Sequence, residues 1–104
     1  MGIAVGMIEV FGLVAAFAAC DAGCKAADVT VEKFDKNKPA NADSLPVPLL
    51  VCVKFRGSVD AVTAALSAAV EAAKSVSGVN AHFIIPNCED DTEKMLKLNG
   101  FDTN

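Results

Sequence analysis

Residues 49–85, LLVCVKFRGSVDAVTAALSAAVEAAKSVSGVNAHFII, decide the fold of this chain. The first seven form an apolar run interrupted only by Lys54, which is typical of a central strand. Ser58 is a favourable helix N-cap, and Gly78 stands where a C-terminal glycine is expected. Between them, apolar residues recur at helical spacing: Val59, Val62, Leu66, Ala69, Ala73 and Val76. Residues 79–85 alternate as a strand does until Pro86. This half of the chain therefore predicts strand, helix, strand.

The first half of the chain predicts the same order. Residues 3–10 indicate a strand that stops at Gly12, residues 13–27 a helix, and residues 29–34 a strand with one exposed face. Residues 35–48 hold three prolines and indicate a long loop. The helix has one stripe expected to face the core, formed by Leu13, Phe17, Cys20 and Cys24.

A short helix is predicted over residues 90–99, because Asp90 and Glu93 have the spacing of a capping box and Asn99-Gly100 stops the helix. The complete order favours an α+β fold, a ferredoxin-like split βαβ sandwich. It has a four-stranded antiparallel sheet, two main helices on one face, and the short C-terminal helix.

Composition excludes several classes of function. The net charge of −4 offers no basic field to a nucleic acid, and the six Phe come without Trp or Tyr for base stacking. No cationic leader precedes Lys25, and the uncharged run 10–20 is too short to cross a bilayer, which predicts a cytoplasmic protein without a membrane partner. Hydrophobic residues make up 53% of only 104, more apolar surface than so small a domain can bury, so self-association is expected.

The chemically reactive residues do not form a predicted site. Cys20, Cys24 and Cys52 are expected in the core as small apolar residues, and Cys88 is expected to be the most exposed thiol. The C-x₃-C spacing lacks a third cysteine nearby, so no metal site is predicted. His82, the single histidine, lies in an alternating strand and is expected to be structural. With no nucleophile–base pair and no phosphate loop, no catalytic residues are predicted and the chain is not expected to be an enzyme.

Four segments, in order along the chain, resemble the shell proteins of bacterial microcompartments. They are GMIEVFGLVAA (6–16), DAGCKAADV (21–29), VCVKFRGSVDAV (51–62) and HFIIP (82–86). The resemblance implies one shell domain over residues 1–104 with its core in 3–86. It implies a structural protein that forms a homohexamer and tiles with other shell proteins of a microcompartment. The ring would pass small metabolites through a central pore, and encapsulated enzymes are a further candidate partner.

The resemblance also suggests interface and pore residues. In relatives, a Lys at the position of Lys25 packs at the hexamer edge. Relatives also carry a small basic or polar pair after the Ile-Pro that helps this contact, whereas here Asn87-Cys88-Glu89 follows Pro86, so Asn87 is the interface candidate and different tiling contacts are expected. Relatives line the pore with a short Gly-rich turn, whereas the loop 37–50 here is longer and has no Gly. The candidates for lining the pore in this chain are Asp43, Ser44, Leu45, Pro46, Val47 and Pro48. An Asp43 ring would favour cations, whereas a Leu-Pro-Val-Pro ring would narrow and dry the opening. Alternatively, the loop lies away from the axis and has no selective role.

Two alternative functions remain at this stage. One is a hexameric shell protein that holds a metal or an iron–sulfur cluster for electron transfer, as some relatives do at the pore. The other is a ferredoxin-like sensor that binds a small ligand between subunits. No cysteine lies within the loop 37–50, so the expectation is that the protein holds no cofactor.

Overall fold

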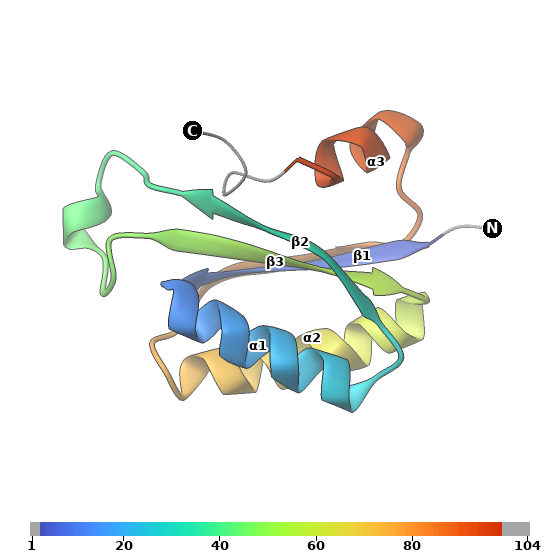
Figure 1. Ribbon diagram of the computed structural model, residues 1–104, viewed down its shortest axis with the longest axis horizontal. Helices are drawn as coiled ribbons and strands as arrows, with labels where there is room; N and C mark the ends of the chain where they lie inside the picture. Colours follow the sequence, from blue (N-terminus) through green and yellow to red (C-terminus); the bar gives the residue numbers. More distant parts are fainter. Residues whose placement is uncertain (1–2, 99–104) are drawn as a thin grey trace.

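The computed structural model describes residues 3–98, in which a twisted sheet has two helices on one face and a short helix on the other (Figure 1). The elements are β1 (Ala4–Phe11), α1 (Leu13–Ala26), β2 (Thr30–Asn37), the 3-10 turn η1 (Ala42–Ser44), β3 (Leu50–Gly57), α2 (Val59–Lys74), β4 (Val79–Ile85) and α3 (Asp90–Leu96). The predicted fold class is confirmed.

The four strands are antiparallel and lie in the order β2-β3-β1-β4. Strands β1 and β3 pair without a break, with Ile8 opposite Val53 at the centre. Because α1 and α2 cover one side of this central pair and α3 part of the other, β1 and β3 carry the longest apolar runs. Strands β2 and β4 are the two opposite edges.

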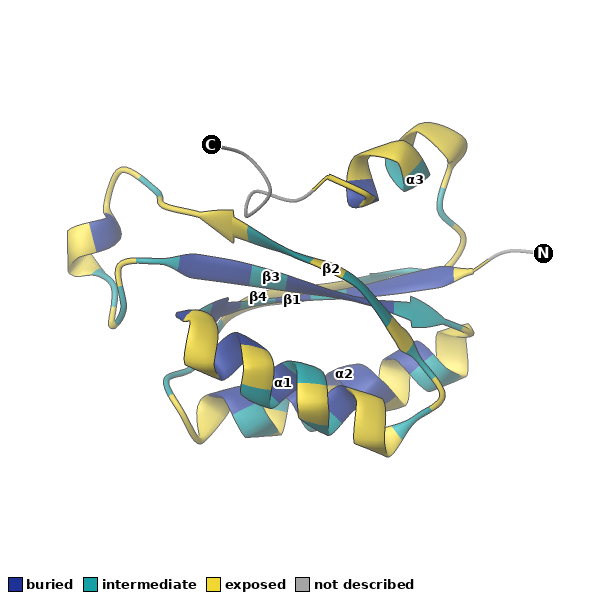
Figure 2. Ribbon diagram, in the orientation of Figure 1, coloured by how far each residue is buried: buried dark blue, intermediate teal, exposed yellow. Residues whose placement is uncertain are grey.

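The core lies between the sheet and the two long helices (Figure 2). The sheet supplies its largest fully buried side chains, among them Phe55 and Ile8, whereas the helices supply mostly alanines. In α2 the predicted stripe is confirmed at Val62, Leu66, Ala69 and Ala73. Val59 and Val76, at its two ends, are exposed.

The predicted core stripe of α1 is wrong. The buried residues of this helix are Ala15, Ala16, Ala19 and Gly23. Leu13, Phe17 and Cys24 are exposed and Cys20 is only half-buried. The reason is the close approach of α1 to the sheet: a Cβ on Gly23 would lie 2.4 Å from Cζ of Phe55. Only the smallest side chains fit there, so the larger apolar residues of α1 point away from the core.

The element ends follow local chemistry. The Ser58 hydroxyl accepts a hydrogen bond from the Ala61 amide (3.1 Å), which confirms the predicted cap, and Gly78 has φ of 134°. The predicted cap of α3 is wrong by one residue: Glu89, and not Asp90, accepts from the Asp91 amide. The predicted stop of this helix at residues 99–100 lies outside the described residues.

The loop between β2 and β3 is shorter and more ordered than predicted. Strand β2 extends to Asn37, which pairs with Leu50 of β3. The remaining residues contain η1 and return to the body of the protein, where the Gly12 amide donates to the Leu49 carbonyl (2.8 Å). Gly12 has φ of 89°, and Val47 packs directly over it. The loop therefore has a fixed base on the turn that leads into α1.

Candidate assembly surfaces

An apolar surface lies at the β2 edge of the protomer. Phe17 of α1 packs edge-to-face against Phe34 of β2, with ring centroids 5.0 Å apart. Phe17 is nevertheless 60% exposed, and Val14, one turn earlier, is 73% exposed. We call the surface formed by Leu13, Val14, Phe17 and Phe34 the α1–β2 patch. An edge-to-face aromatic pair that still exposes most of one ring is typical of a surface that binds a partner.

A second, differently shaped surface lies at the β4 edge. Helix α2 and strand β4 enclose an open groove of about 490 Å³. We call it the α2–β4 groove; its lining is Thr63, Leu66, Ser67, Val70, Glu71, His82, Phe83 and Ile84. Strand β4 carries no charged residue, in contrast to β2, which carries four. Since free edge strands are normally protected by charge, an uncharged edge beside an apolar groove indicates a contact surface.

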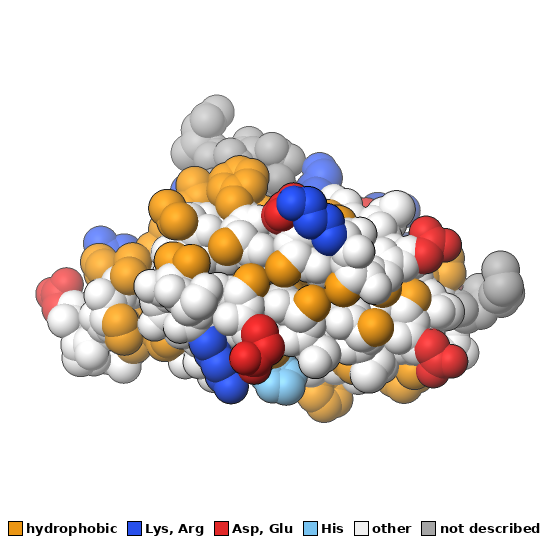
Figure 3. Space-filling view, turned by 90° about the horizontal axis from the view of Figure 1, so that it is seen from below, with side chains coloured by type: hydrophobic (Ala, Val, Ile, Leu, Met, Phe, Trp, Pro, Cys, Tyr) orange, Lys and Arg blue, Asp and Glu red, His pale blue; other side chains and the backbone are white. Residues whose placement is uncertain are grey.

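The helix layer itself presents mixed chemistry. Figure 3, which views this layer from below, shows hydrophobic side chains spread over the face with a few charged side chains among them. The exposed ion pair Lys25–Asp21 (2.8 Å) lies at the C-terminal end of α1. Surface ion pairs of this kind add little stability, so α1 is held in place mainly by its buried small residues.

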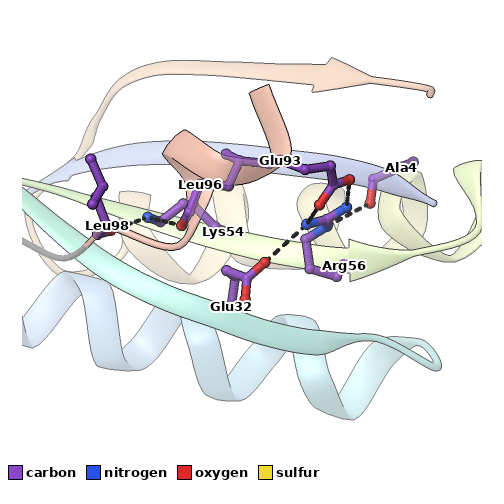
Figure 4. A network of polar contacts seen from close by, with 7 residues as sticks. All are labelled: Ala4, Glu32, Lys54, Arg56, Glu93, Leu96 and Leu98. Atoms are coloured by element: carbon purple, nitrogen blue, oxygen red, sulfur yellow. Dashed lines mark hydrogen bonds and ion pairs between the residues drawn. The ribbon is translucent and has the colours of Figure 1, made fainter. Parts of the chain in front are cut away.

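Helix α3 is fixed to the opposite face of the sheet by two basic residues of β3 (Figure 4). Lys54 is 3% exposed, and its ammonium donates to the carbonyls of Leu96 (2.7 Å) and Leu98 (2.9 Å). The side chain thus satisfies carbonyls at the end of α3 that the helix leaves unpaired. Leu96 is also the buried residue of α3. The last turn of α3 is therefore held on the sheet both by the buried Leu96 side chain and by the hydrogen bonds from Lys54.

Arg56, two residues along β3, holds the other end of α3. Its guanidinium donates to both carboxylate oxygens of Glu93, to Glu32 of β2 (2.9 Å) and to the Ala4 carbonyl (3.2 Å). The hydrogen bonds from Arg56 lower the pKa of Glu93. The helix itself was predicted, but its two basic anchors on β3 were not. Lys54 was the one available signal, as the single charge within the apolar run of residues 49–55.

The predicted pore residues lie at the tip and on the return of the loop after β2. Asp43, Ser44, Pro46 and Pro48 are exposed. Leu45 is half-buried, as is Val47, which packs against Gly12. The tip is internally bonded, since Ser44 donates from both its amide and its hydroxyl to the Asn41 carbonyl (2.9 and 2.7 Å). The four exposed candidates therefore present one carboxylate, one hydroxyl and two proline rings, and Lys38 and Asn41 of the same loop are exposed as well.

The other predicted residues are spread over the protomer. Lys25 is exposed in the last turn of α1, and Asn87 is exposed between β4 and α3. Cys24 is the exposed thiol, whereas Cys88 is half-buried, so the expectation for Cys88 is wrong. Burial raises the pKa of Cys52 to about 11. His82 is exposed and lines the α2–β4 groove. Within residues 3–98, no group of three or more His, Cys, Asp or Glu is placed to hold a metal ion.

Comparison with known proteins gives the family. A family model described as the BMC domain matches residues 4–88. This chain belongs to the BMC domain family. The shell protein PduA of Citrobacter freundii is 40% identical over 93 residues, covering 89% of this chain and 90% of the relative. The carboxysome shell protein CcmK3 of a Halothece strain is 35% identical over 100 residues, covering 94% of this chain and 89% of the relative.

A solved structure agrees with the BMC domain assignment. A microcompartment protein of Desulfitobacterium hafniense matches with a TM-score of 0.71 and 26% identity, over 93% of this chain. The chain spans about half of that protein, 48% of its length. None of the helices within residues 3–98 has the length and hydropathy needed to cross a membrane. Membership of the BMC domain family, whose named relatives are microcompartment and carboxysome shell proteins, supports a structural shell role.

Proposed function

We propose that this chain is a non-enzymatic tile of a bacterial microcompartment shell, in the cytoplasm, whose protomers join head to tail into a cyclic hexamer. The observation that carries the proposal is the pair of different apolar surfaces at opposite edges of one sheet. The α1–β2 patch carries the Phe17–Phe34 ring pair, and the α2–β4 groove is hollow. When a protein contacts its own copy through two unlike surfaces, the assembly is heterologous and closes into a ring if the rotation permits.

The chemistry of the two surfaces is compatible with mutual burial. The exposed ring of Phe17 is a suitable anchor for the apolar walls of Leu66, Val70 and Ile84. In the groove, His82 and Glu71 supply polar groups at the rim, as interfaces usually have. Such a contact uses the apolar excess of a 104-residue chain that cannot be buried within one protomer.

Light scattering tests the ring. Six protomers of 10.7 kDa give a particle of about 64 kDa. We expect Phe17→Lys to produce smaller species with unchanged circular dichroism, because a charge on the patch opposes its burial. Met95→Lys is the matched control: Met95 is 63% exposed against 60% for Phe17, but lies on α3, on the other side of the sheet. A Phe17→Lys protein that keeps the full mass contradicts the proposed contact.

The tile edge is proposed to include Lys25 and Asn87, through which hexamers contact other hexamers and other shell proteins. Lys25 is exposed at the end of α1 and is free to change partner, because its bond to Asp21 is a surface pair. We expect Lys25→Ala to abolish extended sheets in electron micrographs while leaving the hexamer intact. Lys74→Ala, at the exposed end of α2, is the control that should retain sheets.

The central pore for small metabolites is proposed to be lined by the loop after β2. Its support is the exposure of Asp43, Ser44, Pro46 and Pro48 on a tip held by its own hydrogen bonds. Six copies of the Asp43 carboxylate would favour cations over anions. A cryo-electron microscopy map of the ring tests this: Asp43 should face the six-fold axis, and a position on the outer rim would contradict the assignment.

A further inference from the structure

A second hollow lies at the end of the sheet where the proposed tile-edge residues are found. At this end the start of β1 lies beside the end of β3 and the end of β4. Figure 1 shows the connection from α1 to β2 at the same end, beside the start of α2. The hollow has a volume of about 380 Å³, and we call it the end hollow. Lys25, in the last turn of α1, and Asn87, just after β4, are close to it in sequence.

The end hollow combines apolar walls with one uncommitted carboxylate. Ile3 and Val29 form part of its lining, and Ile3 is 47% exposed. Arg56 also lines it, but its guanidinium already binds two carboxylates, and its side chain is only 10% exposed. Asp28 is exposed, and within residues 3–98 its carboxylate has no hydrogen bond or ion pair. The hollow therefore has one charged group available to a partner.

We propose that Asp28 binds the Lys25 ammonium of a neighbouring hexamer, whose side chain lies in the end hollow. The inference rests on the proposed tile edge and names the group with which Lys25 pairs across it. A lysine side chain fits both parts of the hollow, because its methylenes cover apolar surface and its ammonium pairs with a carboxylate. Lys25 is available for this role, since it is exposed and its bond to Asp21 is a surface ion pair.

The partner is a second copy of this chain because the same surface carries both charges. Lys25 and Asp28 are exposed and three positions apart, at the end of α1 and just beyond it. When a two-fold axis relates two copies, residue i of one contacts residue j of the other, and j contacts i. One contact between hexamers therefore forms two Lys25–Asp28 pairs.

The end hollow is preformed and its surroundings favour a cation. A Cβ on Gly57 would lie 3.1 Å from the Asp28 carbonyl oxygen and 3.3 Å from Cγ1 of Val29, so the connection after α1 packs closely on the end of β3. A site that is already ordered loses less entropy on binding. Because two carboxylates bind the single guanidinium of Arg56, the charge around the hollow is negative even before Asp28 is counted.

Charge reversal in two separate samples tests the pair on the full chain. Lys25→Asp leaves only carboxylates at the two positions and Asp28→Lys leaves only ammoniums, so rings of either variant should stay apart at about 64 kDa. Mixed together, the two variants should associate into larger particles by light scattering, because each then meets the opposite charge. The control partner for Lys25→Asp carries Lys25→Ala and Asp91→Lys, which places the new lysine on α3. A mixture that does not associate, or a control that associates equally, overturns the proposal.

Asp28→Asn separates this inference from the tile edge itself, because it removes the charge and keeps the shape. The protein concentration at which sheets appear in electron micrographs should rise about 10-fold for the two pairs lost, with the ring mass unchanged. Asp91→Asn, at an exposed carboxylate of α3, should leave that concentration unchanged. If Lys25→Ala removes sheets and Asp28→Asn does not, the tile edge stands and Asp28 is not the partner of Lys25. If Lys25→Ala retains sheets, both proposals are overturned.

Discussion

Gly23→Ala is the substitution that tests most directly why α1 turns its small residues inward. In a free helix this change is stabilising, by about 1 kcal/mol, because glycine has the poorer helix propensity. In this protein Gly23 is buried, and its new Cβ would lie 2.4 and 2.5 Å from two ring carbons of Phe55 and 3.2 Å from the Ala65 carbonyl oxygen. The substitution therefore has two opposed effects on stability: a gain in helix propensity and a loss from overpacking against Phe55.

The magnitudes decide the sign. Contacts of 2.4 Å are about 1 Å shorter than ordinary van der Waals contact, and Phe55 is 0% exposed, so its ring has no free space to enter. Overpacking of this kind costs about 1–3 kcal/mol. Because the Phe55 ring cannot move aside, we expect this cost to exceed the propensity gain and leave a net loss of up to about 2 kcal/mol. A loss of 1 kcal/mol in the free energy of unfolding lowers the midpoint temperature of thermal unfolding by about 4–8 °C in a domain of this size.

The assay is urea unfolding and thermal unfolding at one fixed protein concentration, because the proposed assembly would contribute to the apparent stability. Phe55→Leu supplies the internal control, since it removes the ring atoms that the new methyl group meets. In that background Gly23→Ala should lose its cost and become neutral or stabilising, which gives a coupling of about 1–3 kcal/mol. If Gly23→Ala stabilises the unsubstituted protein, the close approach of α1 to the sheet does not determine which residues face inward.

Two further predictions concern the attachment of α3. Lys54→Met should lower the protection of α3 amides from hydrogen exchange by about 1–3 kcal/mol, because the Leu96 and Leu98 carbonyls lose their buried donor. The amides of β1 should stay protected, and equal changes in both elements would refute a local anchor. Hydrogen bonds from Arg56 hold the pKa of Glu93 in the folded state below its value in the unfolded chain. Glu93 therefore stabilises α3 fully above about pH 4.3, and this stabilisation is lost as the pH falls through the lower pKa of the folded state. Glu93→Gln should abolish this acid dependence of α3 exchange, and an unchanged pH profile would show that the carboxylate does not hold the helix.

The fold was predictable because its signals are local. Ser58, Gly78 and Pro86 mark element ends through hydrogen-bonding capacity and backbone geometry, which do not depend on distant residues. The anchors of α3 were not predictable in the same way. Arg56 meets Glu93 across 37 positions of sequence, and nothing in the local pattern of either residue indicates the other. Their pairing depends on the sheet bringing β3 beneath the C-terminal helix.

The failed prediction for α1 has a different physical cause, and it bears on assembly. Periodicity identifies the faces of a helix correctly, but the assumption that the larger apolar residues face the core holds only when one chain supplies the whole interior. Here Ala15, Ala19 and Gly23 face the protomer's own core, whereas Phe17 faces outward. Small residues allow α1 to lie close to the sheet, and large residues offer area to a partner. A helix with its small residues buried and its large apolar residues exposed is therefore the arrangement expected of a chain that folds and then assembles, and it supports the contact proposed for the α1–β2 patch.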